Sequence, residues 1–246
     1  NRYLKVKFAL TSSDGVYSGT ISDYIIYYYQ DVVAPTNPTT LNSYSTATQS
    51  ASITTNTWYN HTAPNFDWPN AEATGGATDS TGGSGIAGYY VYFGTNSTVD
   101  ATTSGTLTTA SSYTASSLTS GNTYYLRIQT VDDDGNFSTV NWQPFIYKFD
   151  NEAPSNPTTV TADPPGYTAS NNFAVSWSGA TDSASLVNQY CYKLSSSGSE
   201  TCTTEASASG ALAYQTGTNS FYVRSKDTAG NYASDYVKDF FQTGTN

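Results

Sequence analysis

Apolar and polar residues alternate along many short stretches of this chain, as they do in β-strands with one buried face. In residues 3–10, for example, Leu4, Val6, Phe8 and Leu10 would share one face of a strand. The clearest further stretches are residues 21–29, 89–93, 124–128, 173–177, 190–194 and 237–241. The spacing of three and four residues that marks an amphipathic helix does not recur over any useful length. The pattern therefore predicts an all-β protein of antiparallel strands.

The run of strands is interrupted twice by nearly the same proline-bearing segment. Residues 31–40 read DVVAPTNPTT, and residues 150–159 read DNEAPSNPTT. Proline fixes its own φ and keeps the preceding residue extended, so each segment should act as a stiff joint. After each joint the same landmarks return: an aromatic strand ending in tryptophan, the phrase GATDS and an aspartate-containing turn. We therefore predict two β-sandwich modules in tandem, residues 31–149 and residues 150–246.

Residues 1–30 stand apart from the two modules. Their two alternating stretches flank Asp14-Gly15, a turn-forming pair, and so predict a β-hairpin. An isolated hairpin is marginally stable in water, so other structure should cover its apolar face. Two interpretations are open: the tail of a preceding β-domain, or strands donated to a neighbouring subunit. Because the chain has no methionine and no leader-like start, we expect it to be cut from a larger precursor.

Composition and charge narrow the range of partners. Nineteen acidic against nine basic residues give a net charge of −10, which disfavours nucleic acid and anionic membranes. Aromatic residues make up 15% of the chain, too many for a disordered polar tract. No apolar stretch is long enough to insert into a membrane as a helix. The abundance of Ser and Thr suits short strands and extracellular surfaces.

The first module carries a set of landmarks in a particular order. They are Trp68, Tyr89-x-Val91, Leu118-x-x-Gly121-x-x-Tyr124 and the strand ending VDDDGNFS in residues 131–138. This set resembles fibronectin type III domains and related bacterial immunoglobulin-like repeats. The second module keeps VSW and RSKDTAGN but has Asn219 where the corner tyrosine of the family would lie.

The resemblance implies a fold, namely tandem antiparallel β-sandwiches of the fibronectin type III or immunoglobulin-like kind. It implies little about activity, because this architecture serves many unrelated tasks. The repeated phrases DxxAP and DxAGN look like those of long bacterial cell-surface proteins. That likeness implies an extracellular or cell-surface location.

The two cysteines are the strongest chemical signal. Cys191 and Cys202 flank a Ser- and Gly-rich turn symmetrically, so a hairpin would set them opposite each other. Directly opposed Cβ atoms lie about 4.5–5.5 Å apart, close to what a disulfide needs. Because Cys191 alternates with Tyr190 and Tyr192, the bridge should lie on the outer face of the sheet. A disulfide indicates an oxidising compartment; the alternative is two free thiols, and a metal site lacks a nearby histidine.

The acidic turns are a second candidate site. If their oxygen ligands converge at a joint, they could bind Ca²⁺ and stiffen it. The candidate ligands are Asp132, Asp133, Asp134 and Asn136 at one end of the first module, with Asp150 and Glu152 at the following joint. Weaker versions of the same idea involve Asp31 at the first joint, and Asp227 with Asn231. The alternative is that these residues only shape turns, with no cofactor at all.

A catalytic site is not predicted. His61 is the sole histidine and lies in a polar stretch, so no set of nucleophile, base and orienting group can be assembled. Asp79 and Asp182 occupy equivalent positions in the two modules, which fits a structural turn better than a pair of glycosidase carboxylates. We expect no enzyme activity.

Outward tyrosines are a third candidate surface. Tyr90, Tyr92 and Tyr125 could stack on a glycan or on another subunit, although tyrosine is also simply common in strands. We predict a non-enzymatic extracellular segment of a large surface or secreted protein. It would act as a rigid spacer, an adhesive element or a self-assembling unit of a filament or surface layer, with other copies or neighbouring domains as partners. The alternative is an accessory spacer or carbohydrate-binding module of an extracellular polysaccharide-degrading enzyme.

Overall fold

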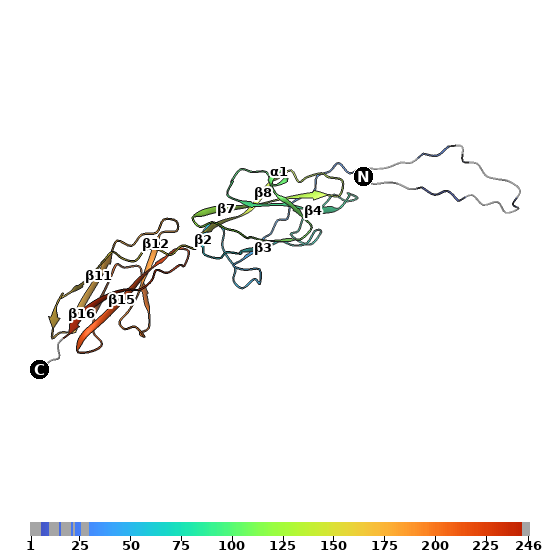
Figure 1. The fold of residues 1–246 in the computed structure, drawn as a ribbon. Coiled ribbons are helices and arrows are strands. Elements are labelled where there is room, and N and C mark those ends of the chain that lie inside the picture. Colours follow the sequence, from blue (N-terminus) through green and yellow to red (C-terminus); the bar gives the residue numbers. More distant parts are fainter. Residues whose placement is uncertain (1–5, 10–14, 16–20, 22, 26–29, 243–246) are drawn as a thin grey trace.

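The structure is a computed structural model that describes residues 6–9, 15, 21, 23–25 and 30–242 of the chain. Within these residues the secondary structure is nearly all β, and it forms two sandwiches placed end to end (Figure 1). The predicted all-β fold of tandem antiparallel sandwiches is confirmed. We use the name module 1 for residues 31–149 and module 2 for residues 150–242.

Module 1 packs a three-stranded sheet of order β1-β3-β6 on a five-stranded sheet of order β2-β8-β7-β4-β5. Its strands pair antiparallel except β2, which runs parallel to β8. Its elements are β1 (Asn42–Tyr44), β2 (Thr57–Tyr59), β3 (Asn65–Asp67), β4 (Ile86–Gly94), α1 (Ala101–Ser104), β5 (Thr106–Thr108), β6 (Ser112–Thr114), β7 (Asn122–Asp132) and β8 (Trp142–Phe149).

Module 2 repeats this arrangement with a three-stranded sheet of order β14-β11-β9 and a five-stranded sheet of order β10-β16-β15-β12-β13. The parallel exception recurs as well, because β10 runs parallel to β16. Its elements are β9 (Thr159–Asp163), β10 (Tyr167–Thr168), β11 (Phe173–Ser178), β12 (Val187–Lys193), β13 (Thr201–Thr203), β14 (Ser207–Gly210), β15 (Gly217–Asp227) and β16 (Tyr236–Gln242).

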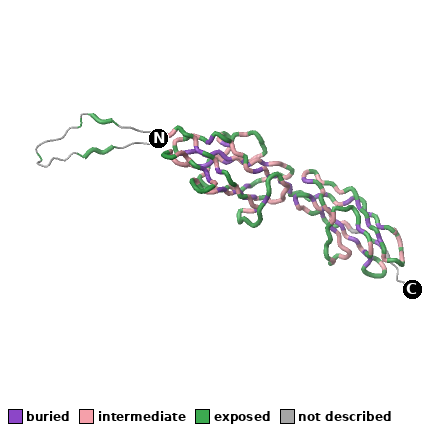
Figure 2. Tube along the Cα trace, turned by 180° about the vertical axis from the view of Figure 1, so that it is seen from behind, coloured by how far each residue is buried: buried purple, intermediate pink, exposed green. Residues whose placement is uncertain are grey.

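Each module has its own hydrophobic core, seen as buried positions inside each sandwich in Figure 2. In module 1, Phe66 from one sheet and Leu126 from the other are both fully buried. In module 2, Trp177 stacks on Phe221 across the sandwich, with ring centroids 5.8 Å apart. The two clusters share no residue, so each module can fold around its own interior.

The corner before the central strand is closed differently in the two modules. In module 1 the hydroxyl of Tyr124 accepts a hydrogen bond from the backbone N–H of Thr119 at 2.7 Å. In module 2 the side-chain oxygen of Asn219 accepts hydrogen bonds from the N–H groups of Tyr214 and Gln215, at 3.0 and 3.1 Å. The departure from the family pattern at Asn219 therefore keeps the backbone contact while changing the side chain that makes it.

The hairpin predicted for residues 1–30 lies mostly outside the described residues. The parts that are described extend away from module 1 in Figure 1. The rings of Phe8 and Tyr24 lie 5.4 Å apart, which places the two stretches side by side at that point. The exposed fractions of Phe8 and Tyr24 are 50% and 61%, so their apolar surface has no cover from the described part of this chain.

Candidate functional site

The joint between the two modules is organised around Asp150, which is fully buried. One carboxylate oxygen accepts hydrogen bonds from the Ser120 hydroxyl of module 1 at 2.9 Å and from the Glu152 N–H at 3.1 Å. The other oxygen accepts from the N–H of Ser185, in a loop of module 2, at 3.2 Å. The Asp150 N–H donates to the carbonyl of Tyr59 in module 1 at 3.0 Å. A single side chain therefore links loops of both modules.

Further contacts between the modules surround Asp150. The side-chain amide of Asn231 donates to the Asp150 carbonyl at 3.0 Å, and its oxygen accepts from the Asn60 amide of module 1 at 3.1 Å. The Asn151 N–H donates back to the Ser120 hydroxyl at 3.0 Å. We call Asn60, Ser120 and Gly121 the tail of module 1. We call Asp150, Ser185 and Asn231 the head of module 2.

The charge of Asp150 is stabilised at this joint. Burial alone raises the pKa of the Asp150 carboxyl, because it disfavours the ionised form. Hydrogen bonds from Ser185, Ser120 and Glu152 act in the opposite direction and outweigh burial, so the pKa lies below its ordinary value. Asp150 is thus an ionised, buried group that depends on donors from both modules.

The first joint repeats the side-chain contacts of this geometry at Asp31, although the Asp31 N–H donates to Asp134 at 2.9 Å, where the Asp150 N–H donates to Tyr59. Its carboxylate accepts from the N–H groups of Val33 and Ser84, each at 2.9 Å, and the Asn136 amide donates to its carbonyl at 3.0 Å. The hydrogen bond from Val33, followed by that from Ser84, lowers the pKa of the Asp31 carboxyl. We call Asp31, Ser84 and Asn136 the head of module 1, because they match Asp150, Ser185 and Asn231 one for one.

Two groups of three carboxylates form at these heads. One group is Asp31, Asp79 and Asp132, and the other is Asp150, Asp182 and Asp227. In each group the nearest oxygens all lie within 4.8 Å of one another. Converging carboxylate oxygens are ligands that Ca²⁺ prefers. Described ion pairs lie elsewhere, between Lys193 and Asp235 and between Arg224 and Glu200.

We call these two groups the carboxylate triads. Hydrogen bonds within the surrounding loops also hold the carboxylates of each triad. Asp132 and Asp227 are both buried, and each accepts hydrogen bonds from the backbone and side chain of the asparagine four residues later. Asp79 accepts from the N–H groups of Ser80 and Gly85, each at 2.7 Å. The carboxylates therefore shape turns, as the turn interpretation expects, and at the same time converge on one point.

The structure divides the predicted set of acidic ligands between two places. Asp132 ends β7, whereas Asn122 at the other end of β7 pairs with Phe149, the neighbour of Asp150. A strand of this length separates its ends by roughly 30 Å. The expectation that Asp132 to Asn136 share one end of module 1 with Asp150 and Glu152 is therefore wrong. Asp132 joins Asp31, and Asp150 joins Asp227.

Asp133, Asp134 and Glu152, which also belong to the predicted set, lie outside the two triads. Asp133 and Glu152 are exposed, and Asp134 accepts a hydrogen bond from the Asp31 N–H at 2.9 Å. The triads instead contain Asp79 and Asp182, which are not among the ligands predicted from the sequence. A signal for them was present in the sequence, since GATDS occurs in both modules along with DxxAP and the aspartate turn.

The predicted disulfide is confirmed. Cys191 on β12 and Cys202 on β13 are direct partners in the sheet, with an S–S distance of 2.05 Å. Tyr190 and Tyr192 pack on the core, and Cys191 points to the opposite, outer face. There it lies beside Arg224, which pairs with Glu200 at 2.8 Å. The bridge thus pins the edge strand β13 to the rest of the sheet.

The three predicted binding tyrosines lie half-buried along the five-stranded sheet of module 1. Tyr90 contacts Phe137 edge to face, with ring centroids 5.8 Å apart. The Tyr92 hydroxyl accepts a hydrogen bond from the Asn96 N–H at 3.0 Å and so helps to hold a loop. Tyr125 lies on β7, one strand over. The structure therefore gives Tyr90 and Tyr92 packing and loop-holding roles.

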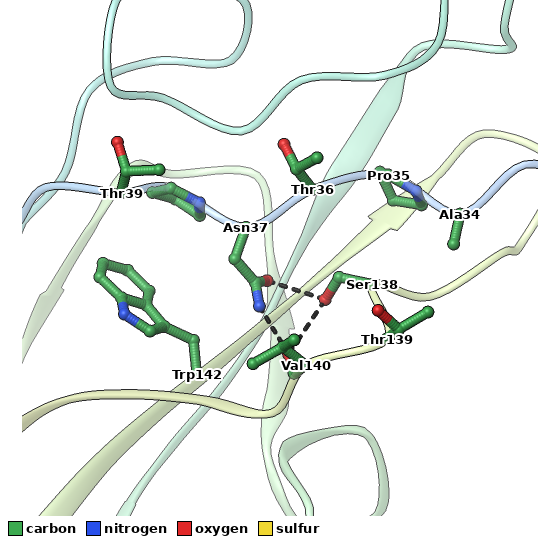
Figure 3. A pocket seen from close by; sticks show the side chains of 10 residues that line it. Ala34, Pro35, Thr36, Asn37, Thr39, Ser138, Thr139, Val140 and Trp142 are labelled. Atoms are coloured by element: carbon green, nitrogen blue, oxygen red, sulfur yellow. Dashed lines mark hydrogen bonds between the residues drawn. The ribbon is translucent and has the colours of Figure 1, made fainter.

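A hollow of about 520 Å³ lies beside the first joint (Figure 3). The proline segment forms one wall, and residues 138–142 form the other, with Trp142 among the lining side chains. Asn37 crosses between the walls, accepting from the Ser138 hydroxyl at 2.8 Å and donating to the Val140 carbonyl at 2.5 Å. This bridge fixes the proline segment against module 1.

His61 takes part in packing. The Tyr147 hydroxyl donates to the His61 carbonyl at 2.6 Å, the His61 ring stacks beside Tyr59, and burial lowers the pKa of the His61 imidazole.

In the part of the chain that the structure describes, α1 is four residues long, and no helix there could span a membrane.

No protein-family model and no curated protein matches the chain. Among solved structures, the FN1–FN3 domains of chicken CNTN1 are 16% identical, over 85% of this chain and 69% of that chain, with a TM-score of 0.44. The fibronectin(III)-like modules of Clostridium thermocellum CbhA are 13% identical, over 76% of this chain and 90% of that chain, with a TM-score of 0.41. The fibronectin type III-like fold of the chain rests on its own architecture, two sandwiches that each pack a three-stranded sheet on a five-stranded sheet.

Proposed function

We propose that this chain is a non-enzymatic, extracellular structural segment of a surface or secreted protein. It acts as a rigid spacer, or as the rigid unit of an adhesive or self-assembling array. The observation that carries this proposal is the Asp150 joint, where one buried carboxylate is bonded to Ser120 of module 1 and Ser185 of module 2. An oxidising, extracellular location is supported by the disulfide.

The test of rigidity is whether the modules tumble together in solution. We expect ¹⁵N relaxation to give one shared rotational correlation time for modules 1 and 2. Asp150→Ala should remove the bonds to both modules and separate the two correlation times. Glu152→Ala is the matched control, because its exposed side chain is next to the joint and its contribution there is a backbone N–H. Independent tumbling of the modules in the unmodified chain would rule out a rigid spacer.

We further propose that a divalent cation such as Ca²⁺ binds at the two carboxylate triads and stiffens the heads. Like charges this close repel one another, and a cation bound among the three carboxylates of a triad, whose oxygens lie within 4.8 Å of one another, would replace that repulsion with attraction. Addition of Ca²⁺ should raise the melting temperature, and Asp182→Asn should remove the effect for module 2 alone. An unchanged melting temperature with Ca²⁺ and with a chelator would count against the metal but leave the spacer role intact.

A second candidate function is that of a carbohydrate-binding or spacer module accompanying an extracellular polysaccharide-degrading enzyme. It is favoured by the hollow beside Trp142, because indole rings commonly stack on sugar faces. Glycan-array binding that is lost in Trp142→Ala, and kept in Trp58→Ala, would support it. Absence of any glycan binding would leave the spacer role alone.

A further inference from the structure

The two module heads are built alike but are occupied differently. At the head of module 2, the tail of module 1 adds two hydrogen bonds: Ser120 donates to Asp150, and Asn60 donates to Asn231. At the head of module 1 the equivalent acceptors are one carboxylate oxygen of Asp31 and the side-chain oxygen of Asn136. Among described donors, the first receives the Val33 N–H and the second receives none. The head of module 1 thus keeps the acceptors that a tail fills at the next joint.

A hollow of about 290 Å³ lies at the head of module 1, and its lining includes Asp31, Val33, Gly83, Ser84 and Asp134. At the second joint the corresponding approach is close, because a Cβ built on Gly121 of the tail would meet the Cβ of Ala184 at 3.8 Å. Ala184 precedes Ser185 as Gly83 precedes Ser84. The hollow at the head of module 1 therefore corresponds in position to the place at the second joint where the tail of module 1 contacts module 2.

The sequence before Asp31 identifies the kind of tail that fits. Residues 3–7 read YLKVK and residues 14–18 read DGVYS, and they match YLRIQ in residues 125–129 and DGNFS in residues 134–138. In module 1 these last two stretches belong to β7 and the turn that leads into β8, the strand that ends at the following joint. The segment before the first joint thus resembles the end of a module, in the same order and next to the same kind of joint.

We propose that the head of module 1 is a docking surface for the tail of another module of this kind, placed N-terminally adjacent. The inference rests on the proposed role as a rigid tandem spacer. The partner presents a small hydroxyl-bearing loop to Asp31, as Ser120 does to Asp150, and an amide donor to Asn136, as Asn60 does to Asn231. The side-chain acceptors of Asp31 and Asn136 are then filled as those of Asp150 and Asn231 are.

The test is a chain in which a second copy of residues 31–149 replaces residues 1–30, so that Phe149 of the added copy is followed by Asp31. Module 1 holds a complete core within these residues, so the copy should fold. We expect the added copy and module 1 to share one rotational correlation time by ¹⁵N relaxation. The amide signals of Val33 and Ser84 should also shift relative to the unmodified chain, because the Asp31 carboxylate gains a donor.

Matched variants separate this inference from the proposed function. Ser120→Ala in the added copy should loosen the Asp31 joint alone, and Ser120→Ala in module 1 should loosen the Asp150 joint alone. A mobile Asp31 joint beside a rigid Asp150 joint would overturn the docking inference and leave the spacer role standing. If the Asp31 joint is rigid and stays equally rigid with Ser120→Ala in the added copy, the inference is also overturned, since the contact would then differ from the one inferred. Mobility at both joints would overturn both.

Discussion

At the corner before β7 module 1 uses Tyr124, and at the corner before β15 module 2 uses Asn219, yet both accept a hydrogen bond from the N–H five residues upstream. In module 1 the tyrosine ring also stacks on Phe93, with centroids 5.4 Å apart. In module 2 the amide instead adds two donated bonds, to the carbonyls of Gln215 and Gly217. The position requires a side-chain acceptor for a backbone N–H, and each module adds either aromatic packing or further hydrogen bonds.

The same contrast extends across the modules. Module 1 connects its sheets through many aromatic side chains, among them Phe66, Phe93 and Tyr147. Module 2 also connects its sheets through aromatic contacts, such as Trp177 on Phe221, and adds a disulfide between β12 and β13 within one sheet. Module 1 should therefore depend chiefly on packing, and module 2 on a smaller core together with polar and covalent links. The predictions below test this contrast, beginning with the largest effect.

Removal of the core tryptophan should separate the modules most clearly. Trp177→Ala should destabilise module 2 by about 3–5 kcal/mol, because it leaves a cavity between the sheets. Trp68→Ala should do the same to module 1. Since the cores share no residue, each change should shift one of two unfolding transitions in denaturant, followed by the NMR signals of each module. A shift of both transitions by either variant would show that the modules unfold as one unit.

The corner residues should differ in cost. Asn219→Ala should destabilise module 2 by about 3 kcal/mol, because buried N–H and C=O groups lose their partners. Tyr124→Phe should cost module 1 about 1 kcal/mol, because the ring and its stacking remain while one hydroxyl is lost. Urea titration of each variant measures both values. Equal costs would contradict this contrast, because Tyr124→Phe removes one hydroxyl whereas Asn219→Ala removes all the hydrogen bonds of its side chain.

The disulfide should stabilise module 2 alone. Replacing both cysteines, as Cys191→Ala with Cys202→Ala, should cost about 2–3 kcal/mol, because the unfolded chain regains the freedom of the closed loop. Calorimetry with and without a reductant checks this on the unmodified chain. A fall in the melting temperature of module 1 under the same reductant would contradict the assignment of the bridge to module 2.

Sequence reasoning could predict what alternation and local pairing determine. Phe66, Trp68 and Trp177 are core residues because they face inward on strands, and Cys191 faces Cys202 because a symmetric turn joins them. The helix α1 was not predicted, since four residues capped by Asp100 leave no periodic pattern.

Which carboxylates lie together could not be predicted without the path of the chain through each module. Asp132 and Asp150 are close in sequence, but the antiparallel pairing of β7 with β8 carries the chain back along the whole module before it reaches Asp150. Conversely, Asp31 meets Asp79 and Asp132 because three loops converge at one end of the sandwich. Repetition of three phrases in both modules was the available signal, since residues that repeat together can lie together.

The smallest predicted effect concerns acid, and it distinguishes the two joints. Both Asp31 and Asp150 have a pKa below the ordinary value of 3.8, so each stabilises the fold above that pH. This contribution falls as pH drops through the lowered pKa of the folded state, because the protonated carboxyl loses its charge-assisted bonds.

Because Asp150 bonds to Ser120 as well as Ser185, its protonation should loosen the contact between modules, whereas protonation of Asp31 should affect module 1 alone. Rotational correlation times measured from pH 5 downward should therefore separate for the two modules while each remains folded. Asp150→Asn should remove this acid-dependent separation, and Asp31→Asn should leave it unchanged. A separation that persists in Asp150→Asn would assign the acid response of the joint to another group.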